Sequence, residues 1–223
     1  MASYKQSVLL FALLLSYTSA YTYLVFEMEW PGTICQQKSC SAQYLGNFDD
    51  QNFNIHGLWP SGSRSNPCSY PSNCSNDDLD YSQINQSDID YINAYWVGLY
   101  NDSDSFRTHE WQKHGTCFNG SETQFFSTVT SLHKQYNPIK ALANHNIVPS
   151  DNQTYTLTQI QSAIENDFQG PALLKCVYVQ GTQMLSVIDL FISSDLKSLL
   201  KCPCNKNLNS LCNNRDPIVI PTF

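Results

Sequence analysis

The sequence predicts an α+β fold in which a central antiparallel β-sheet packs with several helices in a single disulfide-bonded domain. Patterns typical of strands lie near both ends of the chain, amphipathic helical patterns fill its middle, and nine cysteines follow an apolar leader. The chain has 223 residues, of which 42% are hydrophobic and 14% are charged, which excludes a disordered tail, a collagen-like repeat and a coiled coil. A single domain is the default at this length.

The N-terminus has the pattern of a secretory signal peptide. Lys5 precedes an apolar run, and Thr18 and Ala20 occupy the small-residue positions that signal peptidase reads, so we expect cleavage after Ala20. The apolar run is too short to span a bilayer as a mature helix, which needs ~20 residues. We therefore expect residues 1–20 to be a signal peptide and residues 21–223 to form one exported domain without a membrane anchor.

The first third of the mature chain predicts two strands separated by loops. Residues 21–29 alternate loosely and are rich in Tyr, Val and Phe, which is typical of a strand. Residues 33–52 resemble a disulfide-pinned loop, and residues 53–58 predict a second short strand. Residues 59–82 are rich in Pro, Ser, Asn and Gly and predict a long loop.

The middle of the chain predicts a series of helices. Apolar residues recur at three-to-five spacing over 83–100, and residues 106–114 and 121–136 also have helical patterns. Pro138 is well placed to open a further helix through residue 142, and Thr158 is expected to cap the last one.

The closing third predicts a β-hairpin. Two strand patterns, 174–180 and 184–192, are joined by Gly181-Thr182, a plausible turn. Helices therefore cluster in the middle and strands at the ends, which favours an α+β arrangement.

The nine cysteines favour disulfides over a metal site, because the leader implies an oxidising compartment and no paired CxxC units are present. An odd number leaves at least one thiol free or paired outside the chain. Five glycosylation sequons also fit the secretory route; they begin at Asn73, Asn85, Asn101, Asn119 and Asn152.

Three of the five histidines lie in two compact motifs. The first, FNIHGLWP, places His56 at the end of a strand just before a loop. The second, HEWQKHGTC, contains His109, Glu110, Lys113 and His114. On a helix, His109 would lie one turn from Lys113, and Glu110 one turn from His114.

The second motif is compatible with two other interpretations. A solvated helix face is one, but Trp111 and Cys117 would bury the opposite face and pin the helix end. A zinc site is the other; His109 and His114 are five residues apart, some 140° around a helix by its ~3.6-residue period, and Lys113 would repel a cation. We therefore expect no metal and no cofactor.

The chemistry of these side chains suits the cleavage of RNA by its own 2'-hydroxyl. That reaction needs a base for the hydroxyl, an acid for the departing 5'-oxygen, and positive charge and donors around the phosphorus. Histidine can be either base or acid at mildly acidic pH. These residue types suit the cleavage of RNA, which carries its own nucleophile, and suit the cleavage of DNA poorly. On their own they are also compatible with other acid–base enzymes.

Both histidine motifs resemble the two active-site segments of the ribonuclease T2 family, acid endoribonucleases that include the self-incompatibility ribonucleases of plants. The resemblance extends to Trp30-Pro31-Gly32, to residues 70–74 and 155–164, and to the terminal Pro221-Thr222-Phe223. It implies an α+β fold and metal-independent cleavage of single-stranded RNA, not DNA, through a 2',3'-cyclic phosphate. We expect the enzyme to be a monomer.

The resemblance also implies roles for individual residues. His56 corresponds to the general acid and His114 to the general base. Glu110 and Lys113 match the pair that stabilises the pentacoordinate phosphate, and His109 matches the residue that binds phosphate.

Base recognition is less determined. Trp59 and Phe106 match positions that stack on bases, which suits a broad base preference, with core packing as the alternative for Trp59. Glu29 stands where plant members often have a Gln that contacts a base, and a carboxylate only accepts hydrogen bonds. Ser61 stands where some members place an Asp that reads adenine.

Three disulfides are implied by the same resemblance: Cys35–Cys40, Cys74–Cys117 and Cys176–Cys212. A further disulfide that is common in plant members is absent, because both of its cysteines are missing. Ser41 follows Cys40, and no Cys lies between positions 74 and 117. Cys68, Cys202 and Cys204 stay unassigned.

The acidic charge balance bears on where the protein would act. Twelve basic and 19 acidic residues give a formal charge of -7, which becomes -8 when Lys5 leaves with the leader, so a strongly basic DNA-binding protein is excluded. RNA binding should improve near pH 4 to 5, where carboxylates with reference pKa values of ~3.9 and ~4.3 begin to protonate. We expect a secreted or lysosomal acid ribonuclease, and a catalytically silent recognition protein is the disfavoured alternative.

Overall fold

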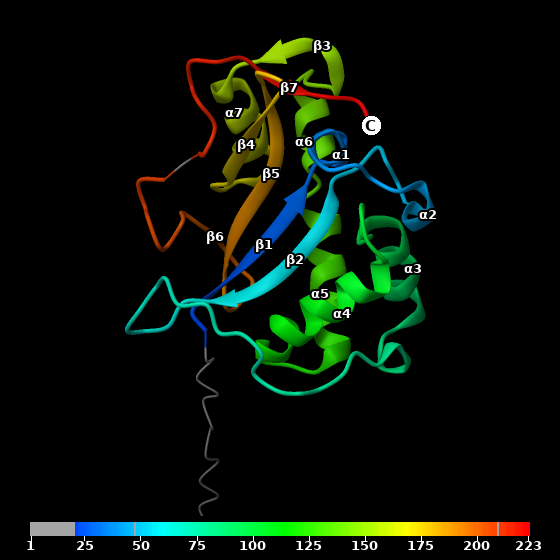
Figure 1. Cartoon of the computed structure of the whole chain (residues 1–223). Coiled ribbons are helices and arrows are strands. Elements are labelled where there is room, and N and C mark those ends of the chain that lie inside the picture. Colours follow the sequence, from blue (N-terminus) through cyan, green and yellow to red (C-terminus); the bar gives the residue numbers. More distant parts are fainter. Residues whose placement is uncertain (1–20, 47, 209) are drawn as a thin grey trace, which may run out of the picture.

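A seven-stranded sheet forms the centre of the fold in the computed structural model, which describes residues 21–46, 48–208 and 210–223 (Figure 1). The strand order is β2-β1-β5-β7-β3, and β4 and β6 also pair with the long strand β5. The strands are β1 Tyr23–Glu29, β2 Asn54–Ser61, β3 Ser150–Tyr155, β4 Leu173–Val179, β5 Thr182–Ser193, β6 Leu199–Leu200 and β7 Ile218–Ile220. The predicted signal peptide lies outside the described residues.

The sheet is mixed rather than fully antiparallel. Every strand pair is antiparallel except β5 and β7, which run parallel because the C-terminal segment returns along β5 in the same direction. The prediction of an α+β fold with a central antiparallel sheet is confirmed, with this one parallel pair added.

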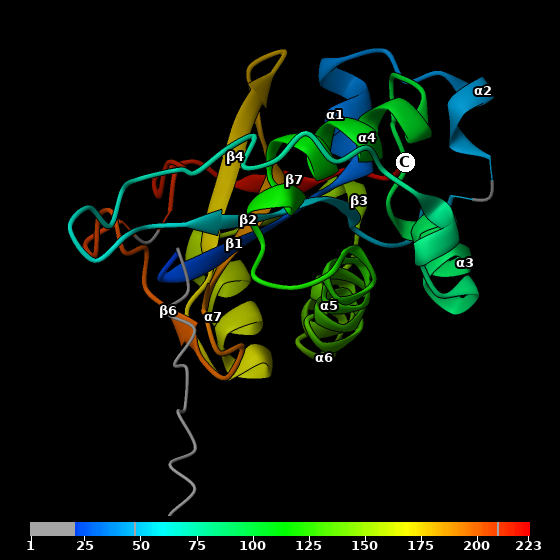
Figure 2. The ribbon, with the colours of Figure 1, turned by 90° about the horizontal axis from the view of Figure 1, so that it is seen from below.

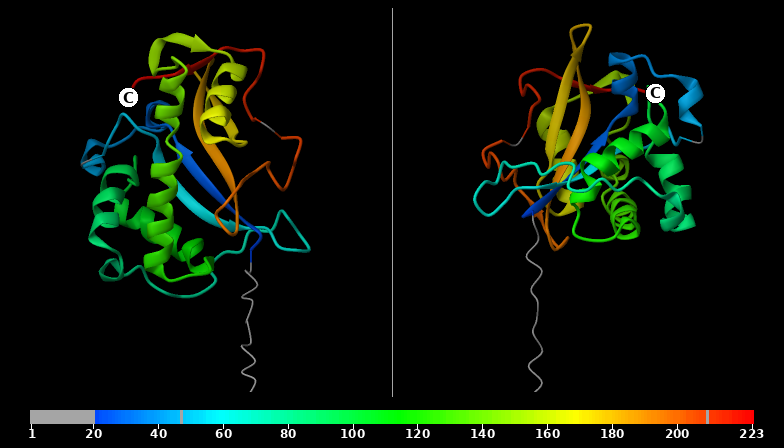
Figure 3. Two further views of the ribbon diagram at one scale, coloured as in Figure 1. Left: turned by 180° about the vertical axis from the view of Figure 1, so that it is seen from behind. Right: turned by 60° about the horizontal axis from the view of Figure 1, so that its bottom comes forward.

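Helices cover one face of the sheet. In Figures 2 and 3, α5, α6 and α7 lie on that face, and α4 lies on the other side of β2 from α5. Their buried side chains meet those of β1 in the main core, as Phe125 and Ile160 do with Phe26. The helices are α1 Pro31–Gln37, α2 Ala42–Leu45, α3 Gln86–Tyr95, α4 Ser103–Lys113, α5 Glu122–Gln135, α6 Pro138–Asn144 and α7 Leu157–Phe168, with 3-10 turns η1 Tyr81–Gln83 and η2 Gly115–Cys117.

Side-chain caps define where several helices begin. Ser121 forms a capping box with the third residue of α5, and Asp102 accepts from the backbone N–H of Ser105, so α4 begins earlier than its apolar pattern indicates. The predicted cap of α7 was wrong by two residues. Thr156, not Thr158, is the cap, because Gln159 completes a capping box with it.

The hairpin between β4 and β5 turns one residue earlier than predicted. Val179 pairs with Thr182, so the two-residue loop is Gln180-Gly181, and both of these residues have positive φ. That backbone conformation matches the twist of a hairpin and suits Gly181.

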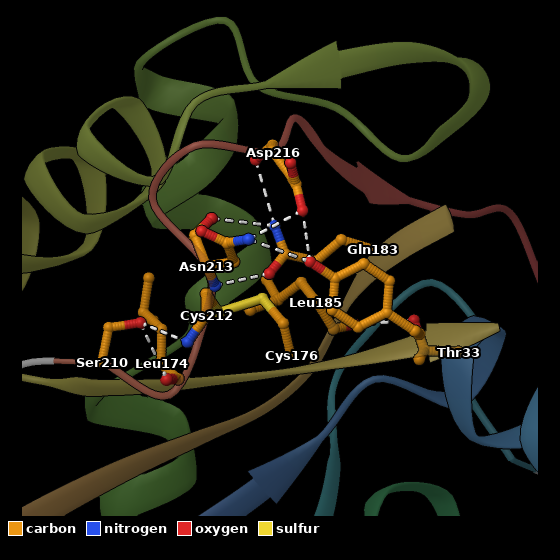
Figure 4. Close-up of a disulfide and its surroundings, with 10 residues drawn as sticks. Thr33, Leu174, Cys176, Gln183, Leu185, Ser210, Cys212, Asn213 and Asp216 are labelled. Carbon is orange, nitrogen blue, oxygen red and sulfur yellow. Dashed lines mark hydrogen bonds between the residues drawn. A yellow bond between two sulfur atoms is a disulfide. The ribbon is translucent and has the colours of Figure 1, made fainter. Parts of the chain in front are cut away.

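Four disulfides cross-link the described residues. Three of them coincide with the pairs that the family resemblance implies, and the fourth, Cys68–Cys204, ties the long loop after β2 to the C-terminal segment. Cys202 is buried and forms no disulfide among the described residues. Figure 4 shows how Cys176–Cys212 is reinforced: the amide of Gln183 donates to the carbonyls of Asn213 and Asp216 and accepts from the backbone N–H of Asn213.

His133 is a buried structural residue of α5. Its Nε2 lies 2.9 Å from the carbonyl oxygen of Phe53, which can only accept, so Nε2 carries the proton and Nδ1 accepts from the Tyr91 hydroxyl at 2.8 Å. Burial lowers the pKa of His133 to about 4, so the ring is neutral at pH 7. The stabilisation that it provides is complete above the ordinary pKa of ~6.5 and is lost as the pH falls toward the folded value.

We expect Tyr91→Phe to lower the free energy of unfolding by about 1–3 kcal/mol, because it leaves Nδ1 of His133 without a donor in the core. Urea denaturation at neutral pH measures this loss. Tyr178→Phe is the matched control, since its hydroxyl also bonds to a side chain but the residue is 54% exposed. Equal stabilities of the two variants would contradict the structural role.

Candidate active site

A β-bulge positions His56. Glu27 of β1 pairs with Gly57, whereas the next residue, Met28, pairs with Ile55, so His56 is the extra residue between them. A bulge of this kind re-aims a side chain. Ile55 is buried in the core, and His56 lies on the opposite, partly exposed side with its Nδ1 3.0 Å from Oε1 of Glu27.

The end of α4 supplies the second group. Glu110 is 3% exposed, and the backbone N–H of His114 donates to its carbonyl at the helix C-terminus. His109 and Lys113 are exposed on the same helix. The disulfide between Cys74 and Cys117 ties the loop after β2 to the turn that follows this helix.

Both groups line one cavity of about 770 Å³. The five titratable residues predicted from the two motifs all lie on its wall, as do the predicted aromatic residues Trp59 and Phe106. Sequence reasoning missed other lining residues, among them the exposed aromatic side chains of Tyr70 and Tyr100. Tyr70 directly precedes the disulfide-bonded Pro-Ser-Asn-Cys segment, which is the signal that could have pointed to it.

Trp59 separates the two catalytic candidates. Its ring lies edge-on to His56 at 5.4 Å and tilted against His114 at 5.3 Å, measured between ring centroids. Its Nε1 donates to Oε2 of Glu110 at 2.7 Å, and Nε2 of His56 lies 3.8 Å from Oε1 of the same carboxylate. Trp59 therefore fixes the buried carboxylate between the two imidazoles.

Gly57 makes this close approach possible. A Cβ at position 57 would lie 2.3 Å from Oε2 of Glu110 and 2.5 Å from Nε1 of Trp59. Any larger residue there has to displace these groups, and the carboxylate has little room to move because Glu110 is 3% exposed and Trp59 is half-buried beside it.

Glu29 lies behind the active-site cavity rather than on its wall. It is 7% exposed and is absent from the cavity wall, because it lies on a central strand behind His56. One of its oxygens accepts from the Asn54 amide at 3.0 Å, and the other lies 3.5 Å from Nδ1 of His56. The arrangement therefore places Glu29 against the imidazole of His56.

The pKa values of the two imidazoles are shifted in opposite directions. Burial opposes the charged form of His56, but hydrogen bonds to Glu27 and then Glu29 outweigh it and raise its pKa to about 11. Burial lowers the pKa of His114 to about 4, and the positive charge of Lys113 acts in the same direction. At pH 5 to 7, one imidazole is therefore a cation and the other is neutral.

Opposing effects act on the pKa of Glu110. Burial raises its pKa above the ordinary value, while the charge of His56 and the hydrogen bond from Trp59 act against that rise. Its protonated form is therefore more accessible at acid pH than that of an exposed glutamate.

Comparison with known proteins finds matches that cover most of the chain. The model of the ribonuclease T2 family matches residues 21–202. Ribonuclease DdI of Dictyostelium discoideum is 32% identical over 187 residues, which cover 82% of this chain and 78% of that protein. Extracellular ribonuclease LE of Solanum lycopersicum is 32% identical over 192 residues, covering 82% and 81%. The crystal structure of RNase NT in complex with 5'-AMP matches 91% of this chain and 99% of its own, with 29% identity and a TM-score of 0.80.

Proposed function

The chain belongs to the ribonuclease T2 family and is an endoribonuclease, and on that premise we propose that it cleaves single-stranded RNA without a metal ion by a two-histidine mechanism. The 2'-hydroxyl attacks its neighbouring phosphodiester, and the products are a 2',3'-cyclic phosphate and a free 5'-hydroxyl. The observation that carries the proposal is a single cavity lined by both His56 and His114, whose surroundings raise the pKa of the first and lower the pKa of the second.

His114 acts as the general base. Its Nδ1 is buried and has no hydrogen-bond partner among the described residues, which leaves Nε2 to accept the proton of the 2'-hydroxyl. A base must be neutral at the working pH, and the lowered pKa of His114 meets that condition.

His56 acts as the general acid and gives the proton of Nε2 to the departing 5'-oxygen. Lys113 and His109 lie on the same cavity wall and supply positive charge for the phosphate. Glu110 lies at the centre of the group and, in its protonated form, donates a hydrogen bond to a phosphoryl oxygen.

Binding and location follow from the same features. We propose that Trp59 and Phe106 stack on bases without strong preference and that the enzyme is a monomer. The disulfides and the relatives described as extracellular and intracellular ribonucleases fit a protein of the secretory pathway. Secretion or delivery to lysosomes is our proposal, as is glycan attachment at the five sequons.

The proposal is tested by incubating the mature protein with RNA near pH 5 in excess EDTA and identifying the products. We expect oligonucleotides that end in a 2',3'-cyclic phosphate, and an all-deoxy strand of the same sequence should stay intact because it lacks the nucleophile. Activity that disappears with EDTA and returns with a divalent cation would overturn the metal-independent mechanism.

Gly57→Ala should lower kcat for RNA cleavage by about 100-fold, since displacement of catalytic groups by about 1 Å has an effect of that size. The added Cβ conflicts with Glu110 and with the Trp59 nitrogen that holds it. Gly181→Ala is the control for backbone strain away from the site: its φ of +82° strains alanine, but the added Cβ meets nothing within 4 Å, so kcat should stay at the wild-type value. Wild-type kcat in a folded Gly57→Ala variant would show that this carboxylate needs no close fit.

A further inference from the structure

A buried ionic cluster lies directly behind His56. Glu27 of β1, Asp189 of β5 and Lys175 of β4 come from three neighbouring strands, and β5 lies between the other two. Nζ of Lys175 lies 2.6 Å from Oε2 of Glu27 and 2.8 Å from Oδ2 of Asp189. Glu27 and Asp189 are 7% and 4% exposed. The mechanism described above uses none of these three groups.

Glu27 divides its two oxygens between this cluster and the active site. Oε2 accepts from the Lys175 ammonium, while Oε1 lies 3.0 Å from Nδ1 of His56. The carboxylate is therefore fixed from behind by one cation and presents its free oxygen to the imidazole.

We propose that Glu27 is a positioning residue for the reaction: anchored by Lys175, it accepts a hydrogen bond from Nδ1–H of His56 and thereby directs Nε2–H toward the leaving oxygen. This inference rests on the proposed role of His56 as the general acid. Orientation of one ring nitrogen by a hydrogen bond to the other is a general way in which proteins set the tautomer and direction of histidine.

Other charged groups around His56 do not replace Glu27. From β1, Glu29 is farther away at 3.5 Å, and its other oxygen is bonded to Asn54. From α4, Glu110 faces Nε2 at 3.8 Å rather than Nδ1. The remaining imidazole and ammonium groups of the same cavity wall, on α4 and at its C-terminus, are those of His109, Lys113 and His114.

The positioning has a consequence for the pH range of the enzyme. Burial alone would favour neutral His56 and leave no proton for the leaving group, whereas the hydrogen bond to Glu27 favours the charged ring. With Glu27 in place, His56 stays protonated through neutral pH, and loss of activity at higher pH must have another origin.

The test is the titration of His56 in Glu27→Gln, followed by NMR of ¹³C-labelled histidine and compared with the pH profile of kcat. We expect the His56 titration to move down by about four pH units, from about 11 toward the ordinary pKa of ~6.5, and kcat to lose at least about tenfold at about pH 8, where a ring with that ordinary pKa is mostly neutral. Asp88→Asn is the matched control, because Asp88 is also 7% exposed and bonds to Ser127 and Thr130 instead. It should leave the His56 titration unchanged.

A second readout separates positioning from general damage to the fold. A substrate with a 4-nitrophenolate leaving group needs no protonation, so the kcat deficit of Glu27→Gln should disappear on it. If Glu27→Gln does not fold, Glu27→Asp, whose carboxylate is drawn back by one methylene, should give a smaller downward shift of the titration.

An unchanged His56 titration in these variants, with His56→Ala inactive on RNA, would overturn this inference alone. Full activity of His56→Ala would overturn the proposed function as well, so the two failures are distinguishable.

Discussion

Replacing His114 by alanine should lower kcat/KM for RNA cleavage by about 10²–10⁴-fold, the range found when a positioned general base is removed. His114 lies on the cavity wall beside Trp59, with Nδ1 buried, and its lowered pKa keeps it neutral where the enzyme works. His56→Ala should cause a loss of similar size, because the 5'-oxygen would then leave without a proton. Steady-state kinetics near pH 5 measures both.

The control for these two variants is His145→Ala. His145 is exposed at the end of α6 and lies outside the cavity, so its loss should leave kcat/KM at the wild-type value. Circular dichroism and thermal unfolding establish that each variant is folded. Near-wild-type activity of a folded His114→Ala protein would remove His114 from the mechanism.

The pH profile of kcat/KM should have an acid limb near pH 4. The base must be neutral, and burial lowers the pKa of His114 to about 4, so protonation removes activity only below that value. Under control of one group, the rate falls about tenfold for each pH unit below the pKa. Between pH 2 and 4 the expected change is therefore up to about 100-fold.

The alkaline side of the profile should depend on salt. His56 stays protonated, but the acidic protein repels RNA more strongly as its carboxylates ionise. Added salt at neutral pH should recover part of the activity by screening this repulsion.

On the acid side, a limb near the ordinary histidine pKa of ~6.5 would contradict the assignment of His114 as the neutral base.

The sequence predicted the elements with strong local patterns. The strands around residues 21–29, 53–58, 174–180 and 184–192 and the helices from α3 to α7 are all present, because alternation, amphipathic spacing and caps are local signals. Strand β3 was missed because its residues are polar and mostly exposed, so they carry no alternating apolar pattern.

Elements that depend on distant contacts could not be predicted in the same way. Helix α1 has no side-chain cap, and its start is held by bonds from Trp30 to the carbonyl of Pro221 and from Thr33 to the carbonyl of Leu185. Strand β7 has three residues and forms by lying parallel to β5. Such contacts join segments far apart in the sequence.

The site was predictable to the level of its two motifs. His56 and the residues of α4 were expected in one place, and the cavity brings them together. The bulge at His56 and the anchoring of Glu27 by Lys175 depend on strand register, which a single sequence does not reveal. The contacts of Glu29 with Asn54 and His56 depend on the same register.

The assignment of His56 as the general acid and His114 as the general base is tested most directly by comparing two substrates. One is RNA, and the other is uridine 3'-(4-nitrophenyl phosphate), whose leaving group needs no proton. Our account predicts that His56→Ala is impaired on RNA but close to wild type on this substrate, whereas His114→Ala is impaired on both. Equal impairment of His56→Ala on both substrates would contradict the assignment of His56 as the general acid.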